Sequence, residues 1–301
     1  MAKHVTDNVA PQHPPRLTKP RGVLWRLTRT RPRLLSICSA VVLGILVALL
    51  FITSPGARVF AHTFLNPHYM KIALLGDPSH NITPMWQAFL KNVLLCVVAE
   101  PLVLILALPV ALLRNAKSPV LAGPRLALTA YVDFARGVPL ILVVLAVYFG
   151  FPILGIPFIS SRTWFQYGLF CLVFCYAAYV SEVYRAGVQS VPFAQTLAGR
   201  AIGLSESQLL RYVTIPQALR IVVAPLINDF VSLQKDTAII GIGAGVIELL
   251  KAAQINQGVF FNDSSYAVAG LLFLTICVPL TRVADRLQAK DMRARLAGSQ
   301  T

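Results

Sequence analysis

The chain has 301 residues, of which 56% are hydrophobic and 13% are charged, and its formal net charge is +15 at pH 7. With a mean hydropathy of +0.67, this composition lies far outside the averages of soluble domains and excludes an ordinary soluble protein. The apolar residues collect in runs of about 20, the length that crosses a bilayer as a helix, so we predict an all-α integral membrane protein.

Six apolar runs are long enough to be transmembrane helices. They are Leu34–Thr53, Val93–Leu113, Leu126–Phe151, Trp164–Val180, Ile221–Ile240 and Tyr266–Thr281. The first run follows a cluster of arginines, so a cleaved signal peptide is the alternative to a retained helix. A signal peptide would have a shorter apolar core nearer the N-terminus, and we therefore expect a signal-anchor helix that stays in the chain.

Lysines and arginines are concentrated in alternate connections between these runs. Residues 1–33, 114–125, 185–220 and 282–301 hold 20 of them, whereas the other connections hold 5. Because basic connections stay in the cytoplasm, this pattern predicts a membrane protein with both termini in the cytoplasm. The positive charge is thus explained by topology, without nucleic acid. The basic first segment either only sets this topology or also holds anionic lipid headgroups.

A polar segment with helix start and stop signals separates the fourth and fifth runs. Ser190 and Pro192 predict a helix start, and Gly203 predicts a left-handed end after Ile202. The spacing of Ser205 and Gln208 is that of a capping box, which predicts a second helix over Glu206–Thr214 that stops before Pro216. The sequence therefore predicts a cytoplasmic helical hairpin, residues 190–216, with small side chains that allow close approach of another protein.

This segment resembles the EAA loop of permease subunits of ATP-binding-cassette (ABC) importers, in the polar amino-acid uptake branch of histidine-, glutamine-, glutamate- and arginine-type permeases. The family pattern GQ-x-EAA-x-A-x-G-L, followed by LPQALR, is matched in AQTLAGRAIGL and IPQALR. The resemblance implies that the hairpin docks in a cleft of the ATPase. The docking residues it implies are Gln195, Leu197, Ala198, Gly199, Arg200, Ala201, Gly203 and Leu204.

Two residues of the hairpin depart from the family pattern. Leu197 stands where the family has Glu, and Gly199 stands where it has the second Ala. The missing acid removes an expected polar contact with the ATPase. Two explanations stay open: a second, more typical permease chain completes the pair, or the position tolerates drift.

Three further segments carry the same resemblance in the same order. Tyr131–Pro152 is similar to Y-V-E-x-x-R-G-T-P-L-L, Ala177–Pro192 to A-Y-x-x-E-x-x-R-G-G-I-x-S-I-P, and Pro225–Ile240 to P-x-x-N-E-F-I-x-L-x-K-D-T-S-L. The similarity covers Trp86–Leu287. It implies the five-helix core of a type I ABC importer permease with one additional N-terminal helix.

The resemblance also implies the partners, the mechanism and a location in the bacterial cytoplasmic (inner) membrane. Two ABC ATPase subunits, a second permease chain that is the same or homologous, an extracytoplasmic solute-binding protein and membrane lipid would surround this chain. It has no G-x-x-x-x-G-K-[ST] sequence, so ATP and Mg would be bound by the ATPase, and the chain would be a transport subunit rather than an enzyme. Polar amino acids are the expected substrates. The alternatives are another small nitrogenous solute such as an opine, or a stand-alone secondary carrier.

Ionisable and amide side chains inside the apolar runs are candidates for pairing, gating or the substrate pathway, because each is costly in a membrane. Asp133 and Arg136 share a helix face, as do Glu182 and Arg185, and such pairs can neutralise each other. Glu100 and Asp229 have no such neighbour. The pathway or gating candidates are Asp133, Arg136, Glu182, Arg185, Asn228, Asp229, Gln234, Lys235 and Asp236.

The expected organisation follows from these patterns. It comprises a disordered basic cytoplasmic tail (1–33), an N-terminal transmembrane helix (34–53), an external loop (54–85), the transmembrane domain (86–287) with its coupling hairpin (190–216), and a cytoplasmic C-terminal tail (288–301). The five cysteines all fall in apolar runs, where we interpret them as small hydrophobic residues, and no metal site is expected.

Overall fold

A computed structural model describes residues 32–116 and 118–298, and the elements of this part of the chain are helical. The chain divides into two compact units, Met1–Val59 and Phe60–Thr301. The predicted disordered tail lies outside the described residues, except for Pro32 and Arg33, which begin helix α2 (Pro32–Thr53). The bounds of α2 agree with the first predicted transmembrane run.

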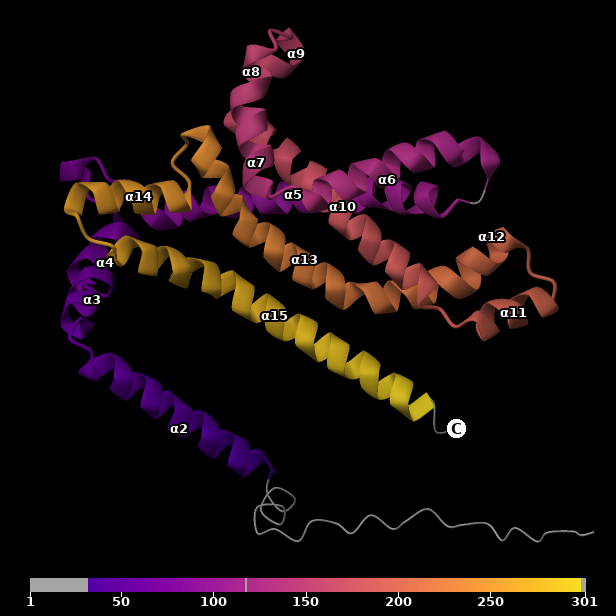
Figure 1. The fold of residues 1–301 in the computed structure, drawn as a ribbon, viewed down its shortest axis with the longest axis horizontal. Helices are drawn as coiled ribbons and strands as arrows, with labels where there is room; N and C mark the ends of the chain where they lie inside the picture. Colours follow the sequence, from indigo (N-terminus) through magenta and orange to yellow (C-terminus); the bar gives the residue numbers. More distant parts are fainter. Residues whose placement is uncertain (1–31, 117, 299–301) are drawn as a thin grey trace, which may run out of the picture. The chain divides into compact units, whose positions relative to one another are not determined.

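Five described helices are long and apolar enough to cross a membrane. These are α2, α5 (Met85–Asn115), α10 (Trp164–Gln189), the continuous helix Glu206–Gly243 and the apolar part of α15 (Ser264–Gly298). Each contains one of the predicted runs. In the larger unit α5, α10 and α13 (Ile215–Ala244) pack on one another, and α15 packs along α13 (Figure 1).

The third predicted run is not one continuous helix. The segments Pro119–Gly137 and Leu140–Ile153 are long and apolar enough to cross a membrane only when taken together, and they are bent by 105°. The bend lies between α6 (Ala122–Gly137) and α7 (Leu140–Leu145), where Val138 has an extended backbone before Pro139. A residue before proline is disfavoured in the helical conformation, and proline has no N–H to donate, so the chain breaks here.

Two π turns lie just before prolines and let a helix continue through them. The turn η3 (Ala146–Gly150) precedes α8 (Phe151–Ile153), and η4 (Leu210–Thr214) joins α12 (Glu206–Leu209) to α13. The predicted stop before Pro216 is therefore wrong. Pro216 lies in the first turn of α13, and the wider π turn before it accommodates the missing proline N–H without ending the helix.

The main hydrophobic core lies where α5, α7, α10 and α13 meet. Its buried residues include Leu95, Val144, Leu172, Leu233 and Ile240. Glycines allow these helices to approach closely: a Cβ at Gly168 would lie 2.7 Å from Cγ2 of Ile240. Close approach at small residues is how helices associate in a bilayer, where apolar burial alone gives little driving force.

The predicted external loop, residues 54–85, contains helices that pack on the transmembrane core. Helix α3 (Ala57–Phe64) leads to α4 (Pro67–Leu75), which contacts α15 and α5, and the short turn η1 (Pro78–His80) follows. Ala73 and Met85 form a second buried cluster with Leu249 and Ala253 of α14 (Leu249–Phe260). This segment is thus part of the larger unit from Phe60 onward.

The far end of the chain is helical over most of the predicted C-terminal tail. Helix α15 continues from the membrane-spanning part to Gly298, which covers all but the last residues of 288–301. Within the larger unit, α11 (Phe193–Ala201) and α12 lie at the end opposite to α4 and α14 (Figure 1). The predicted cytoplasmic and external elements are therefore separated by the length of the transmembrane helices.

Candidate functional site

The predicted polar hairpin is helical, but its first helix does not begin with the predicted Ser190 cap. Ser190 donates its hydroxyl to the carbonyl of Gly187 at 2.7 Å and ends α10, so it does not cap α11. Pro192 precedes the first residue of α11 and makes no side-chain cap. Gly203 has φ +86° and ends the helix in the left-handed region, as predicted.

The second half of the hairpin begins with the predicted capping box. The Ser205 hydroxyl accepts from the backbone N–H of Gln208, and the Gln208 side chain accepts from the backbone N–H of Ser205 at 2.9 Å. Arg200 of α11 donates to the Glu206 carboxylate at 2.8 Å, and this carboxylate raises the pKa of the Arg200 guanidinium. The capping box thus begins the second short helix, and an exposed ion pair joins it to the first.

Gly199 is the buried centre of this hairpin. A Cβ at Gly199 would lie 2.5 Å from Cδ1 of Leu209, so the glycine lets the second arm pack against α11. The departure from the family Ala is explained by this contact. Leu197 is 52% exposed and extends the outer surface of α11 as an apolar side chain. Of the predicted docking set, Gln195, Leu197, Ala198, Arg200, Ala201 and Gly203 are exposed, Leu204 is partly buried and Gly199 is buried.

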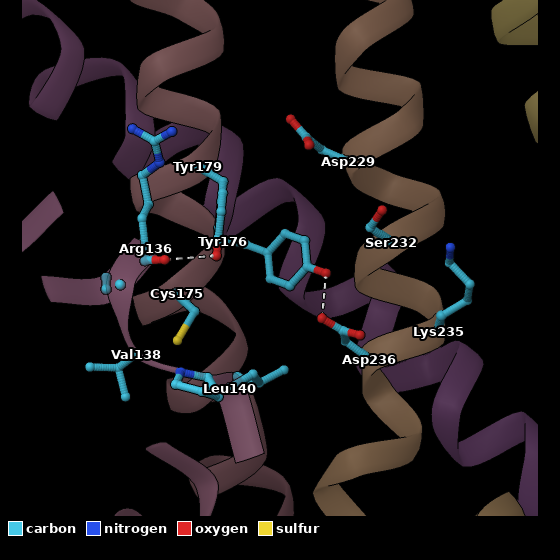
Figure 2. Close-up of a pocket in the computed structure, with 13 residues that line it drawn as sticks. Arg136, Val138, Leu140, Cys175, Tyr176, Tyr179, Asp229, Ser232, Lys235 and Asp236 are labelled. Atoms are coloured by element: carbon cyan, nitrogen blue, oxygen red, sulfur yellow. Dashed lines mark hydrogen bonds between the residues drawn. The ribbon is translucent and has the colours of Figure 1, made fainter. Parts of the chain in front are cut away.

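A pocket of about 560 Å³ lies between α10, α13 and the bend that joins α6 to α7. Figure 2 shows its polar side chains: Asp229, Ser232 and Asp236 follow one another along α13, and Tyr176 extends from α10 toward Asp236. The Tyr176 hydroxyl donates to Asp236 at 2.7 Å, and the Tyr179 hydroxyl donates to the Arg136 carbonyl at 3.4 Å. The lining carries both signs of charge, because Arg136 and Lys235 also belong to it.

Four of the predicted pathway candidates line this pocket: Arg136, Asp229, Lys235 and Asp236. One carboxylate oxygen of Asp229 and one of Glu100 are buried, and neither has a hydrogen-bond partner among the described residues. Gln234 is 1% exposed and lies in the helix packing, whereas Asn228 and Asp133 are exposed and do not line the pocket. Of the five candidates predicted on α13, three therefore line the pocket, and Asn228 and Gln234 do not.

Glu182 joins three arginines from three helices. It accepts from Arg114 of α5 and from Arg185 of its own helix, the latter at 2.5 Å, and the nearest oxygen lies 3.9 Å from Arg136 of α6. The predicted pair of Glu182 and Arg185 is confirmed. Within the described chain, Arg136 forms its ion pair with Glu182 and none with Asp133, so that predicted pair is wrong; the bend after Gly137 directs Arg136 toward α10.

Several polar residues were not singled out from the sequence. Tyr176, Tyr179 and Ser232 line the pocket, and Arg114 completes the Glu182 cluster. The i, i+3 spacing of the two tyrosines, and of Asp229 and Ser232, could have indicated one polar helix face. Arg114 had no such signal, since it looked like an ordinary basic residue at the end of an apolar run.

A second buried polar network lies at the α14 end of the unit. Asn92 of α5 donates to Glu248 at 3.1 Å and to Thr237 at 3.1 Å, and its carbonyl oxygen accepts from the backbone N–H of Leu249. Glu248 is 2% exposed and also caps α14. Its burial raises the pKa of the Glu248 carboxyl, partly offset by these hydrogen bonds. This network fixes α14 against α5 and α13.

The fold and the site define a multi-pass α-helical membrane protein with a polar pocket among its helices and a helical hairpin at one end. Residues 120–290 match the model of the family described as binding-protein-dependent transport system inner membrane component. The chain belongs to this family. It is thus the membrane-spanning permease component of a transport system, and ATP hydrolysis resides in separate subunits.

Similar proteins agree with this assignment. The chain is 33% identical over 162 residues to the probable glutamine ABC transporter permease protein GlnM of Bacillus subtilis (strain 168), covering 54% of this chain and 73% of the relative. It is 30% identical over 211 residues to the probable glutamine ABC transporter permease protein GlnP of the same organism, covering 69% and 93%. The structure described as an amino acid ABC transporter with histidines matches at TM-score 0.61 and 25% identity, covering 68% of this chain and 94% of that chain.

Proposed function

We propose that this permease component imports polar amino acids and that the pocket between α10 and α13 binds them during passage. The observation that carries the proposal is a pocket with both signs of charge: Asp229, Lys235 and Asp236 come from α13, and Arg136 comes from the end of α6 across the pocket (Figure 2). A zwitterionic solute needs both: carboxylates for its ammonium group and cations for its carboxylate. The names of the relatives, which refer to glutamine and to amino acids, support this substrate class.

The unpaired oxygen of Asp229 is the strongest candidate contact for the substrate. A buried carboxylate oxygen without a partner is costly, and an ammonium group donating to it would remove that cost. Asp236 already accepts from Tyr176, so it is held in place and can accept a further hydrogen bond through its other oxygen. Arg136 and Lys235 would then orient the carboxylate end.

The proposed coupling element is the hairpin, residues 190–216. Its outer face is exposed, its two arms are joined by the Arg200–Glu206 ion pair, and α12 continues through η4 directly into α13. An ATPase that moved the hairpin would therefore move α13, which carries Asp229 and Asp236. In this proposal the hairpin end is cytoplasmic, two ATPase subunits bind ATP and Mg, a solute-binding protein docks near α4 and α14, and a second permease chain completes the pathway.

The expected domain organisation is part of this proposal. Helix α2 would be an additional transmembrane helix outside the permease core, since the relatives' matches cover about two thirds of the chain or less. From Ser36 to Thr53 its side chains are exposed and most of them are apolar, as suits contact with lipid. The hairpin, residues 190–216, would be the coupling element of the core.

The test is ATP-driven uptake in proteoliposomes that contain the permease, its ATPase and its binding protein. Radiolabelled glutamine, glutamate, arginine and histidine are supplied separately. Asp229→Asn should lower uptake of the transported amino acid about tenfold or more, because a hydrogen bond to a charged group contributes roughly 1.5–3 kcal/mol. Asp285→Asn makes the same chemical change on an exposed part of α15 and should leave uptake unchanged. Wild-type uptake by Asp229→Asn would contradict the pocket assignment.

A further inference from the structure

A second, strongly basic pocket lies at the ends of α5 and α6, beside α10. Its volume is about 510 Å³. The lining residues are Arg114, Asn115, Ala122, Arg125, Leu126, Thr129 and Arg185. None of them lines the proposed substrate pocket, and three of them carry a guanidinium group.

The positive charge of this pocket is not balanced within the described chain. Arg114 and Arg185 share a single carboxylate, that of Glu182, and Arg125 has no ion pair among the described residues. Glu182 is also within 3.9 Å of Arg136. One negative charge thus serves at least three guanidinium groups. Arg114 has only 11% of its side chain exposed, so water screens this excess charge less than it would at an open surface.

The guanidinium groups are held in position by the protein. Arg125 donates from Nη1 to the Ala116 carbonyl at 2.7 Å, at the end of α5. Arg114 donates from Nε to the Thr129 hydroxyl at 3.5 Å, and that hydroxyl donates to the Arg125 carbonyl at 2.8 Å. Each arginine has five N–H donors, and these contacts use only part of them. Several donors therefore remain for an anion bound between the three arginines.

We propose that this pocket binds a phosphate group. Guanidinium groups match phosphate oxygens with paired hydrogen bonds, and a phosphate would supply the missing negative charge. Leu126, which lines the pocket, is apolar and 72% exposed, and it favours a phospholipid as the bearer of the phosphate. The end of α5 and the start of α6, which contribute most of the lining, lie at the same end of the unit as α11 and α12 (Figure 1), the end for which we propose the cytoplasmic leaflet.

A phosphate in this pocket would also reach the substrate pocket through Glu182. An anion bound to Arg114 and Arg185 would weaken their ion pairs with Glu182. The Glu182 carboxylate could then pair more closely with Arg136, which lines the substrate pocket. Anionic lipid would in this way act on transport without entering the pathway. Binding of the phosphate does not depend on which solute is transported.

The experiment measures lipid bound to the full permease–ATPase complex. Native mass spectrometry counts phosphatidylglycerol retained after extraction from vesicles of phosphatidylcholine and phosphatidylglycerol at 3:1. Arg125→Gln should reduce retained phosphatidylglycerol about tenfold, the effect of losing one charge-assisted contact. Arg125→Lys should retain most of it. Arg211→Gln removes an exposed arginine of η4 outside the pocket and should bind phosphatidylglycerol as the wild type does.

Competition with inorganic phosphate shows whether the bound phosphate group belongs to a lipid or to a soluble molecule. Inorganic phosphate is added at about 10 mM, which is enough for a weak competitor to bind. If phosphatidylglycerol retention depends on Arg125 and persists under this condition, the pocket is a lipid site. Displacement by phosphate, with direct phosphate binding lost in Arg125→Gln, identifies a soluble phosphate as the ligand. Equal retention in Arg125→Gln and Arg211→Gln, with no Arg125-dependent phosphate binding, overturns the proposal. Loss of the ATPase from Arg125→Gln also overturns it, because the pocket would then be an ATPase contact.

Discussion

The contact between Gly187 of α10 and Val222 of α13 gives a quantitative prediction. A Cβ added at Gly187 in the last turns of α10 would overlap Cγ1 of Val222 on α13, and the Ala218 carbonyl oxygen would lie 3.5 Å away. Val222 is 3% exposed and β-branched, so it has little freedom to turn aside within a helix. Gly187→Ala must therefore push α10 and α13 apart.

The magnitude follows from two opposing effects. Overpacking of a core by one methyl group costs about 1–3 kcal/mol, and the severity of this overlap places the cost near the upper value. Alanine gains roughly 1 kcal/mol over glycine in a helix, which leaves a net loss of about 2 kcal/mol. At about 2–4 °C per kcal/mol for a unit of this size, the melting temperature in detergent should fall by roughly 4–8 °C.

The assay is a melting curve of the purified complex, with a second substitution as the decisive comparison. Val222→Ala creates the space that the new methyl group needs, so the double variant should melt above the value expected from adding the two single effects. Gly258→Ala on α14 is the matched control, because nothing lies within 4 Å of the added Cβ, and it should not lower the melting temperature. A Gly187→Ala protein that melts as the wild type does, or additivity with Val222→Ala, would refute the packing account.

Three further predictions concern the caps and charges. Ser205→Ala removes the capping-box acceptor, so the hairpin should lose about 1 kcal/mol and the amides of Glu206–Leu209 should exchange faster; unchanged exchange would show that the cap contributes nothing. Glu182→Gln leaves Arg114 and Arg185 without a carboxylate and should lower stability by about 2–4 kcal/mol, with partial recovery in the double variant with Arg185→Gln. Hydrogen bonds from Ser79, and then the contact with His80, lower the pKa of Asp77 from 3.8 to about 2. Because this folded-state pKa lies below the unfolded one, the stabilisation is present above about pH 4 and is lost as pH falls toward 2. Carboxyl NMR should show this titration, and Ser79→Ala should raise the pKa.

The parts of the fold that depend on local chemistry could be predicted from the sequence. Five of the six apolar runs lie in helices long and apolar enough to cross a membrane, Gly203 marked the end of α11, and the spacing of Ser205 and Gln208 marked the start of α12. Each of these signals acts within a few residues. Pro139 and Pro216 show the limit of such signals, since one breaks a helix and the other, preceded by a π turn, lies inside a continuous one.

The parts that depend on which helices meet could not be predicted. Glu182 and Arg185 are one turn apart, and their pairing was foreseen, but Arg114 lies 68 residues from Glu182 and reaches it only through the packing of α5 on α10. Arg136 has Asp133 as a neighbour in sequence, yet the bend at Pro139 places it near Glu182. The role of Gly199 likewise becomes visible only once Leu209 is in place.

The central claim is that the hairpin couples this permease to an ATPase. The most direct measurement is to purify the tagged chain from its native membrane in mild detergent, identify the proteins that accompany it by mass spectrometry, and repeat this with Gly203→Arg. We expect an ABC ATPase with the wild type and much less of it with Gly203→Arg, whose side chain would project from the exposed left-handed cap. A chain that is recovered alone and still moves amino acid into liposomes without ATP would contradict the account.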